Sequence, residues 1–269
     1  MKKYIFYITL TLAFQLSTGN VESQSTIWWP QKGTVILAGG NLSDPIATYL
    51  EKKLVSIAGG SKSRIVIIPT ANPKFTTKEL DDLKKRFELC GTKEVSILNA
   101  TNKKMANSDS LANILRSATG VFITGGQPML LENMYCGTVV EKELKALLSR
   151  GGVIGGSSAG AIILGDLWLT WTPEFGKRTT DLGILPNVAV SPHANAAKDF
   201  SVDEEVLKYL ITHPTIIGID IDEDTMLILD SQTAEVMGKG HVSILNAAAN
   251  KSKPMLRLSG GEQYQLKSK

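Results

Sequence analysis

Short runs of apolar and β-branched residues alternate with longer amphipathic segments along most of this chain. Runs that are apolar throughout are typical of strands buried on both faces, and their alternation with helices indicates a parallel sheet covered on two sides. We therefore expect an α/β fold, a three-layer α/β/α sandwich with a mainly parallel central sheet. Strands are predicted at 33–40, 64–69, 94–98, 120–124 and 152–156, and helices at 45–58, 77–90, 108–118 and from 158 to 167.

The last third of the chain has a different pattern. Four short apolar runs, at 215–220, 226–229, 235–238 and 242–245, follow one another with turns between them and no long amphipathic segment. We expect these strands to close one edge of the sheet. Glycine pairs end the predicted strands at 39–40, 125–126 and 155–156, and ligands of such sheets bind beyond the carboxyl ends of the strands.

Composition favours one folded unit over residues 24–269. The chain has 269 residues with 20% charged and a net charge of +3, and we find neither a linker nor an internal repeat. Lys and Arg are spread along the sequence, so nucleic acid is not an expected partner. A homodimer is compatible with the sequence, and neither a cofactor nor a metal is predicted.

The N-terminus has the layout of a signal peptide. Lys2 and Lys3 precede an apolar run from 4 to 16 and a polar stretch at 17–20, the order found in export signals. A membrane anchor or a buried first helix is the alternative, but the run is shorter than the roughly 20 apolar residues of a spanning helix. We expect residues 1–23 to be removed, after Gly19 or Ser23, leaving a secreted or periplasmic protein without a stable membrane anchor.

Two cysteines, Cys90 and Cys136, are the whole thiol content of the chain. An exported protein could join them, but the sequence does not show whether their Cα atoms come within disulfide distance. A disulfide and two separate buried thiols both stay open.

The segment 156–160 carries the clearest chemical motif. It reads Gly-Ser-Ser-Ala-Gly and matches G-x-S-x-G between a predicted strand and a predicted helix, which is the context of a nucleophile elbow. The glycines permit a sharp turn that exposes Ser158, and the helix that follows points N–H groups at the same place. A plain small-residue turn or a phosphate-binding loop is the alternative, but the Gly-Lys-Ser/Thr ending of a P-loop is missing.

A serine nucleophile needs a base, and the chain has three histidines. His193 follows the apolar run 187–190 at a predicted strand end, on the side where the glycine turns gather, and is the preferred base. His213 precedes Pro214 in a polar turn, and His241 begins a late edge strand. Surface roles are the better interpretation for both.

Four motifs in order make a more specific pattern than any one of them. The motifs are Thr-Gly-Gly-Gln at 124–127, Gly-Gly-Ser-Ser-Ala-Gly-Ala at 155–161, Asp-Leu-Gly-Ile-Leu-Pro at 181–186 leading to Ser-Pro-His at 191–193, and Gly-Ile-Asp-Ile-Asp-Glu-Asp-Thr at 218–225. In combination they resemble the cyanophycinase and dipeptidase E family of serine peptidases, which has a class I glutamine amidotransferase-like fold, and the resemblance spans about residues 33 to 266.

This resemblance implies roles for individual residues. Ser158 would be the nucleophile and His193 the base. The backbone N–H groups of Ala159 and Gly126, or of Gly125 in place of Gly126, would form the oxyanion hole. The reaction would be hydrolysis of a peptide or isopeptide bond, and the expected partner is a peptide or small acyl substrate.

The resemblance also suggests an orienting carboxylate and substrate contacts. Glu174 falls where family members often have an acidic residue that can orient the histidine, and Asp166 is its competitor. Gln127, Ser191 and Asn195 are expected to contact substrate.

The sequence departs from the family pattern around the expected substrate pocket. Pro128 stands where the family has Gln, and Ser191 where it has Asp two residues before the histidine. The arginine-rich stretch after the family histidine is replaced by Ala-Asn-Ala-Ala-Lys-Asp-Phe at 194–200, in which Lys198 cannot replace bidentate arginines. Cyanophycin is therefore a doubtful substrate.

Two alternatives stay open on these observations. A pseudo-enzyme or binding protein could keep the fold and the serine turn while having weak turnover, and the missing arginines favour it. A glutamine amidotransferase-like domain would need cysteine at the elbow, where this chain has Ser158. A serine-type peptidase is the function we expect.

Overall fold

A computed structural model describes residues 29–166, 182–196, 209–245 and 255–266. Its main feature is an eight-stranded sheet in the order β12-β9-β8-β1-β5-β4-β2-β3. Five neighbouring strands are parallel and three further strands extend the β1 edge in antiparallel pairing. The parallel strands are β1 (Thr34–Ala38), β2 (Arg64–Ile68), β3 (Glu94–Ile97), β4 (Gly120–Ile123) and β5 (Val153–Ser157), and the antiparallel ones are β8 (Thr225–Leu229), β9 (Thr233–Gly238) and β12 (Gln263–Gln265).

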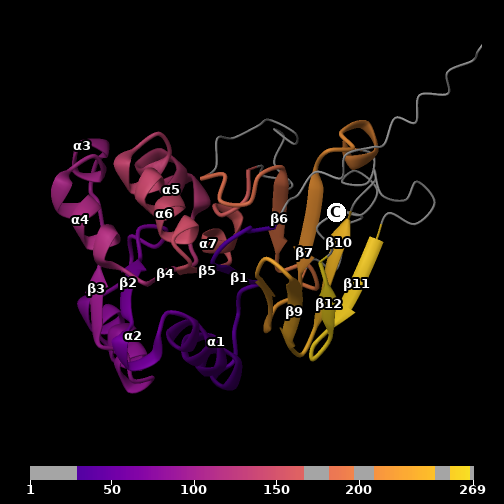
Figure 1. Cartoon of the computed structure of the whole chain (residues 1–269), viewed down its shortest axis with the longest axis horizontal. Coiled ribbons are helices and arrows are strands. Elements are labelled where there is room, and N and C mark those ends of the chain that lie inside the picture. The colour runs from indigo at the N-terminus through magenta and orange to yellow at the C-terminus, as the bar shows by residue number, and fades with distance from the viewer. Residues whose placement is uncertain (1–28, 167–181, 197–208, 246–254, 267–269) are drawn as a thin grey trace, which may run out of the picture.

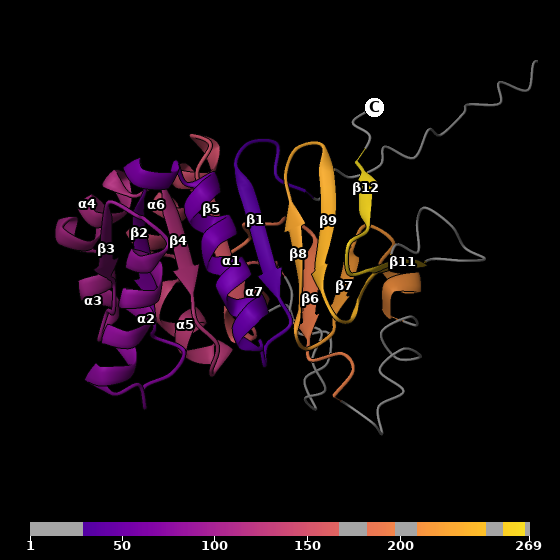
Figure 2. The same cartoon turned by 90° about the horizontal axis from the view of Figure 1, so that it is seen from below.

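Helices cover both faces of this sheet. Figure 1 shows α1 and α2 on one side and α4, α5 and α6 on the other, and Figure 2 shows α1 and α2 lying over the strands. The predicted α/β/α sandwich with a mainly parallel sheet is thus confirmed. The helices are α1 (Asp44–Ile57), α2 (Thr77–Leu89), α3 (Lys103–Ala106), α4 (Asp109–Ser117), α5 (Pro128–Tyr135), α6 (Val139–Ser149), α7 (Ala159–Ile162) and the short 3-10 turn η1 (Gly60–Lys62).

Alternation along β1 shows how the sheet is buried. Ile36 and Ala38 belong to the apolar cluster under α1 and α2, whereas Val35 and Leu37 belong to the cluster on the opposite face. Every residue of β1 is buried, because successive side chains of a strand point to opposite faces and both faces are covered. This explains why the strand is apolar without interruption from Val35 to Ala38.

A second, four-stranded sheet was not predicted. It runs β11-β10-β7-β6, and its residues Val190, Ile219 and Val242 share one apolar cluster with Leu227 of β8 and Leu164 after α7. The small sheet therefore covers one face of β8 and β9. Its strands are β6 (Val188–Pro192), β7 (Ile217–Ile221), β10 (His241–Leu245) and β11 (Met255–Ser259).

The structure corrects two expectations about the elements. Of the four late apolar runs, those in β8 and β9 do close an edge of the main sheet, but those in β7 and β10 lie in the small sheet. The helix expected from 158 to 167 is only α7, four residues long. After it the N–H groups of Leu164 and Gly165 donate three residues back instead of four, and the Asp166 N–H donates to the carbonyl of Val188. Helices α5 and α6 are additional to the predicted elements.

In the part of the chain that the structure describes, no helix has the length and apolar character needed to cross a membrane. Cys90 and Cys136 are not joined by a disulfide.

Candidate active site

Ser158 lies in the sharp turn between β5 and α7. Its backbone has φ 53° and ψ −116°, a left-handed φ that non-glycine residues adopt at a cost of about 1–3 kcal/mol. The flanking glycines are required by space, because a Cβ on Gly156 would lie 2.0 Å from the carbonyl oxygen of Gly160. The Ser158 N–H donates to the Ala38 carbonyl at 2.9 Å. The turn therefore holds the hydroxyl at the carboxyl end of the central strands.

His193 reaches this hydroxyl from the other sheet. It follows β6, and its Nε2 lies 2.8 Å from Ser158 Oγ. The His193 N–H donates to the Gly39 carbonyl at 2.9 Å, and the imidazole packs so closely on Gly40 that a Cβ there would be 2.3 Å from Cε1. The loop after β1 thus fixes both the backbone and the ring of His193.

Glu223 completes a chain of hydrogen bonds. It lies in the turn between β7 and β8, and its Oε1 is 2.7 Å from His193 Nδ1. A carboxylate can only accept, so Nδ1 carries the hydrogen and the neutral ring leaves Nε2 as the acceptor for the Ser158 hydroxyl. This is the tautomer that a general base needs.

Three N–H groups beside Ser158 can receive an anion. Among the described residues, the N–H groups of Gly125, Gly126 and Ala159 make no hydrogen bond. A Cβ on Gly125 would lie 3.7 Å from Ser158 Oγ, and Gly126, at φ +142°, packs against the Ala71 carbonyl. Of the three predicted oxyanion-hole residues, Gly125 and Ala159 thus lie next to the serine, and Gly126 follows Gly125 in the chain.

The residues predicted to contact substrate differ in their surroundings. Gln127 is exposed and precedes α5, where Pro128 takes the first helical position, a place in which a missing N–H costs little. Ser191 is half-buried at the end of β6. Asn195 is exposed, and its Oδ1 accepts the Glu223 N–H at 2.8 Å, so this side chain also holds the turn that carries Glu223.

The carboxylate beside His193 was missed by sequence reasoning. Glu174 lies outside the described residues. Its competitor Asp166 accepts the Asn187 N–H at 3.3 Å. The motif at 218–225 did contain a signal for Glu223, which follows a predicted strand end. Its pairing with His193 could not be recognised from the sequence, because the two residues are 30 positions apart.

The other two histidines do not approach Ser158 in the described contacts. His213 is exposed and stacks on Tyr209 with ring centroids 4.0 Å apart. His241 Nδ1 lies 3.3 Å from Asp222 Oδ2. The position of His213 agrees with the surface role expected for it, whereas His241 is half-buried and begins β10, which pairs with β7 and β11 and is not the edge strand expected.

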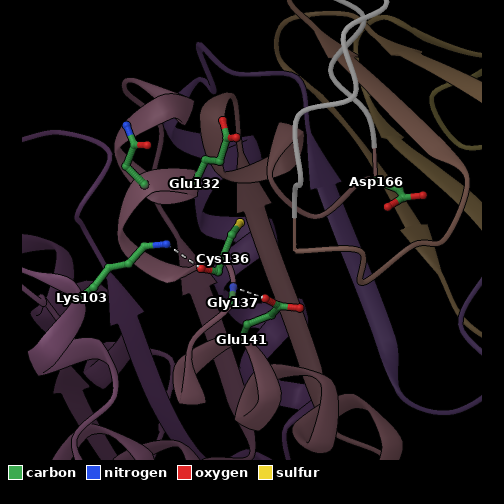
Figure 3. Close-up of a pocket in the computed structure, with 7 residues that line it drawn as sticks. Lys103, Glu132, Cys136, Gly137, Glu141 and Asp166 are labelled. Carbon is green, nitrogen blue, oxygen red and sulfur yellow. Dashed lines mark hydrogen bonds between the residues drawn. The ribbon is translucent and has the colours of Figure 1, made fainter.

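A separate cavity of about 520 Å³ lies beside α5 and α6 (Figure 3). Lys103 donates to the carbonyl of Cys136 there, and the Gly137 N–H donates to Glu141. Burial raises the pKa of Glu132, against the opposing charge of Lys103. None of the three hydrogen-bonded residues Ser158, His193 and Glu223 lines this cavity.

Metal ligation finds no support in the residues that the structure describes. No group of three or more His, Cys, Asp or Glu side chains there could hold a metal ion. The contact between Ser158 Oγ and His193 Nε2 suits nucleophilic attack by a serine with an adjacent base.

Comparison with known proteins gives the same fold. A peptidase from an acI-B1 Actinobacterium matches with a TM-score of 0.69 at 23% identity, over 89% of this chain and 98% of that one. A putative peptidase E protein from Listeria monocytogenes EGD-e matches with a TM-score of 0.50 at 18% identity, over 77% and 98%. At these identities the two structures show the fold alone.

Sequence relatives extend the comparison beyond the fold. A cyanophycinase of Synechococcus elongatus is 28% identical over 226 residues, 80% of this chain and 68% of the relative. A cyanophycinase of Geminocystis herdmanii (strain PCC 6308) is 27% identical over 227 residues, 81% of this chain and 82% of the relative. Residues 34–237 match the sequence profile of Peptidase family S51, which confirms the resemblance stated above. The chain belongs to peptidase family S51 and is a serine-type peptidase.

Proposed function

We propose that this protein hydrolyses a peptide or isopeptide bond through an acyl-enzyme on Ser158. In the first step Ser158 Oγ attacks the substrate carbonyl carbon while His193 Nε2 takes the hydroxyl proton. The N–H groups of Ala159 and Gly126, or Gly125, receive the negative charge that develops on the carbonyl oxygen. His193 then gives the proton to the leaving amine.

The second half of the reaction reverses these roles. Water gives a proton to His193 Nε2 and attacks the acyl carbon, and Ser158 leaves with that proton. Glu223 accepts from Nδ1 throughout, which keeps the ring in its tautomer and stabilises the imidazolium formed in each half.

One observation carries this proposal: the hydrogen-bonded chain from Ser158 Oγ to His193 Nε2 at 2.8 Å and from His193 Nδ1 to Glu223 Oε1 at 2.7 Å. The three residues come from three separate segments, and both sheets contribute. A nucleophile hydrogen-bonded to a base that is itself held by a third group is the arrangement by which such sites are recognised.

A fluorophosphonate probe tests the mechanism without knowledge of the substrate. We expect it to label the wild type on Ser158, and Ser158→Ala to abolish labelling. His193→Ala should reduce turnover of a cleavable peptide by roughly 1,000-fold or more, and the double variant should cost little more because the pair acts as a unit.

The neighbouring serine provides the matched control. Ser157 is half-buried at the end of β5, and Ser157→Ala should keep labelling near the wild-type rate. Labelling that survives Ser158→Ala unchanged would refute the mechanism. A folded wild type that neither labels nor cleaves peptides would favour the alternative, a catalytically weakened binding protein on the same fold.

For the substrate we propose a peptide or acyl compound other than the aspartyl-arginine polymer for which the relatives are named. Among the residues that the structure describes, no arginine occurs in the loops at 39–43, 125–129, 191–196 and 222–224, which carry or contact Ser158, His193 or Glu223. In these loops a substrate carboxylate would lack the bidentate partner that arginine supplies. The test is to compare the rate at which the protein cleaves the members of a peptide library with the rate at which it cleaves cyanophycin. Efficient cleavage of cyanophycin would contradict the proposal.

We also propose that the protein is exported. The support is the sequence order of Lys2 and Lys3 followed by the apolar run 4–16. Mass spectrometry of the protein from its native host should find an N-terminus between about residues 20 and 27, where a signal peptide of ordinary length ends. Recovery of the form that keeps Met1 would count against export.

A further inference from the structure

Glu223 accepts a second hydrogen bond on the oxygen that faces His193. The side-chain nitrogen of Asn41, Nδ2, lies 2.5 Å from Glu223 Oε1. Because a carboxylate only accepts, the amide nitrogen of Asn41 must be the atom that faces it. Asn41 belongs to the loop after β1 in the main sheet, so this contact joins the main sheet to the turn that carries Glu223.

The backbone of Asn41 is fixed for this contact. Asn41 has φ 45°, and the carbonyl of the preceding Gly40 accepts the Asp224 N–H at 3.0 Å. The hydroxyl of Ser43 donates to Asp224 Oδ1 at 2.7 Å. Ser43 is the N-cap residue of α1, yet its side chain makes no capping bond to the helix. The loop 40–43 is therefore tied to the turn 222–224 at the expense of a helix cap.

We propose that Asn41 is a positioning residue that acts on His193 through Glu223, an inference that rests on the proposed function. The glutamate side chain is 26% exposed and has several rotatable bonds, so a single contact to His193 would leave it able to turn toward water. Two donors on Oε1 hold the carboxylate in line with Nδ1. The ring then keeps its acceptor nitrogen toward Ser158.

A turn residue without this role would behave differently on substitution. Asparagine is common at left-handed φ, and glycine is at least as well suited to that conformation. If Asn41 served only the turn, Asn41→Gly would be harmless. If it positions Glu223, the same change removes a donor to a charged group while the backbone is kept.

The test measures the rate of fluorophosphonate labelling of Ser158 as a function of probe concentration. This gives two quantities, the affinity of reversible probe binding and the maximal labelling rate. We expect Asn41→Gly to lower the maximal rate by about 10-fold or more, the loss typical of one hydrogen bond to a charged group, with binding unchanged. Asn41→Asp should lose at least as much, because it places a carboxylate against Glu223. Asn187→Gly is the control, since Asn187 also has a left-handed φ of 56° but makes no described contact with Glu223.

A double-mutant cycle shows whether the effect passes through the carboxylate. In a Glu223→Gln background, Asn41→Gly should cost little further, because the group it positions is already changed. An additive loss, or wild-type labelling by both Asn41 variants, would overturn the inference while leaving Ser158 labelling and the proposed function intact. Wild-type labelling that does not depend on Ser158 would overturn both.

Discussion

At the scale of single residues, non-glycine residues with a strained backbone cluster around the candidate active site. Five non-glycine residues of the described chain have positive φ, and four of them, Asn41, Ser158, His193 and Asp224, lie at or beside the hydrogen-bonded chain. Each such residue costs about 1–3 kcal/mol unless the surroundings hold it. The packing of the two sheets supplies that support. The strained conformations place the Ser158 hydroxyl and the His193 imidazole in contact.

The role of Glu223 can be separated from that of Glu174 by matched changes. We expect Glu223→Gln to lower the labelling rate by roughly 100-fold or more, because an amide facing Nδ1 can favour the wrong tautomer. Glu174→Gln should stay near the wild-type rate. The measurement is the rate of fluorophosphonate labelling at one fixed pH, after both variants have been shown to be folded. A large loss at Glu174 with none at Glu223 would reverse the assignment.

Gly40 provides a second test at this scale. A Cβ at Gly40 would lie 2.3 Å from the His193 ring, whereas one at Gly59 would meet nothing within 4 Å, although both glycines have positive φ. Both alanine variants should lose stability by about 1–2 kcal/mol from the left-handed backbone. Only Gly40→Ala should also lose most labelling. Equal labelling by the two folded variants would show that the imidazole has room to move.

Ser158 and His193 could be predicted because their signals are local. The glycines within two positions of the serine indicate it, and the apolar strand before the histidine indicates the histidine. Glu223 and Asn41 act across segments far apart in the sequence, and the distance of 182 residues between them leaves no local pattern. Asn195 was predicted to face substrate, and only the structure shows its bond to the Glu223 N–H.

At the scale of elements, the turn from β7 to β8 is held by its acidic residues. Asp224 pairs with Lys239 at 2.7 Å and accepts two bonds from Ser43. Burial pushes the pKa of Asp224 upward, but the hydrogen bonds from Lys239 and Ser43 prevail and hold the pKa below its ordinary value of 3.8. The ionised carboxylate is therefore the form that the folded turn prefers.

This gives a pH-dependent prediction. Because the folded pKa is lowered, Asp224 stabilises the protein at pH values above 3.8, and this contribution disappears as the pH falls through the folded pKa. Asp224→Asn should lower the free energy of unfolding at neutral pH, and the difference from wild type should shrink under acid. Denaturant titrations across pH measure it. Asp81→Asn, at an exposed position of α2, is the control, and a difference that grows under acid would contradict the prediction.

Hydrophobic periodicity predicted which helices and strands exist better than it predicted which strands pair with one another. The boundaries of α1, α2 and α4 lie within about two residues of the expected ones, as is usual for helix ends. The same apolar pattern occurs in β7 and in β8, but β8 takes the open edge of β1 while β7 pairs with β6. Which sheet a strand joins depends on which edges are still open, and that is a property of the assembled fold.

At the scale of the whole molecule, the two sheets share one apolar cluster. Ile219 of the small sheet is fully buried in it. Ile219→Ala should lower the free energy of unfolding by about 2–5 kcal/mol through lost burial and the cavity left behind. Loss of circular dichroism and loss of labelling should occur at the same denaturant concentration.

An exposed leucine gives the comparison for that experiment. Leu89 is 78% exposed at the end of α2, and Leu89→Ala should change stability by only about 0.5 kcal/mol. If labelling by the Ile219 variant disappears well before the circular dichroism changes, the small sheet separates from the main sheet by itself.

The division of the site between two sheets has a consequence for the newly made chain. The serine turn belongs to the part that leaves the ribosome first, while the base lies 35 residues later and the carboxylate another 30 after that. On the proposed mechanism, a partly folded chain has a hydroxyl without a base and cannot attack peptide bonds of its neighbours. Activity begins only when the small sheet docks, so the enzyme stays latent until its fold is complete.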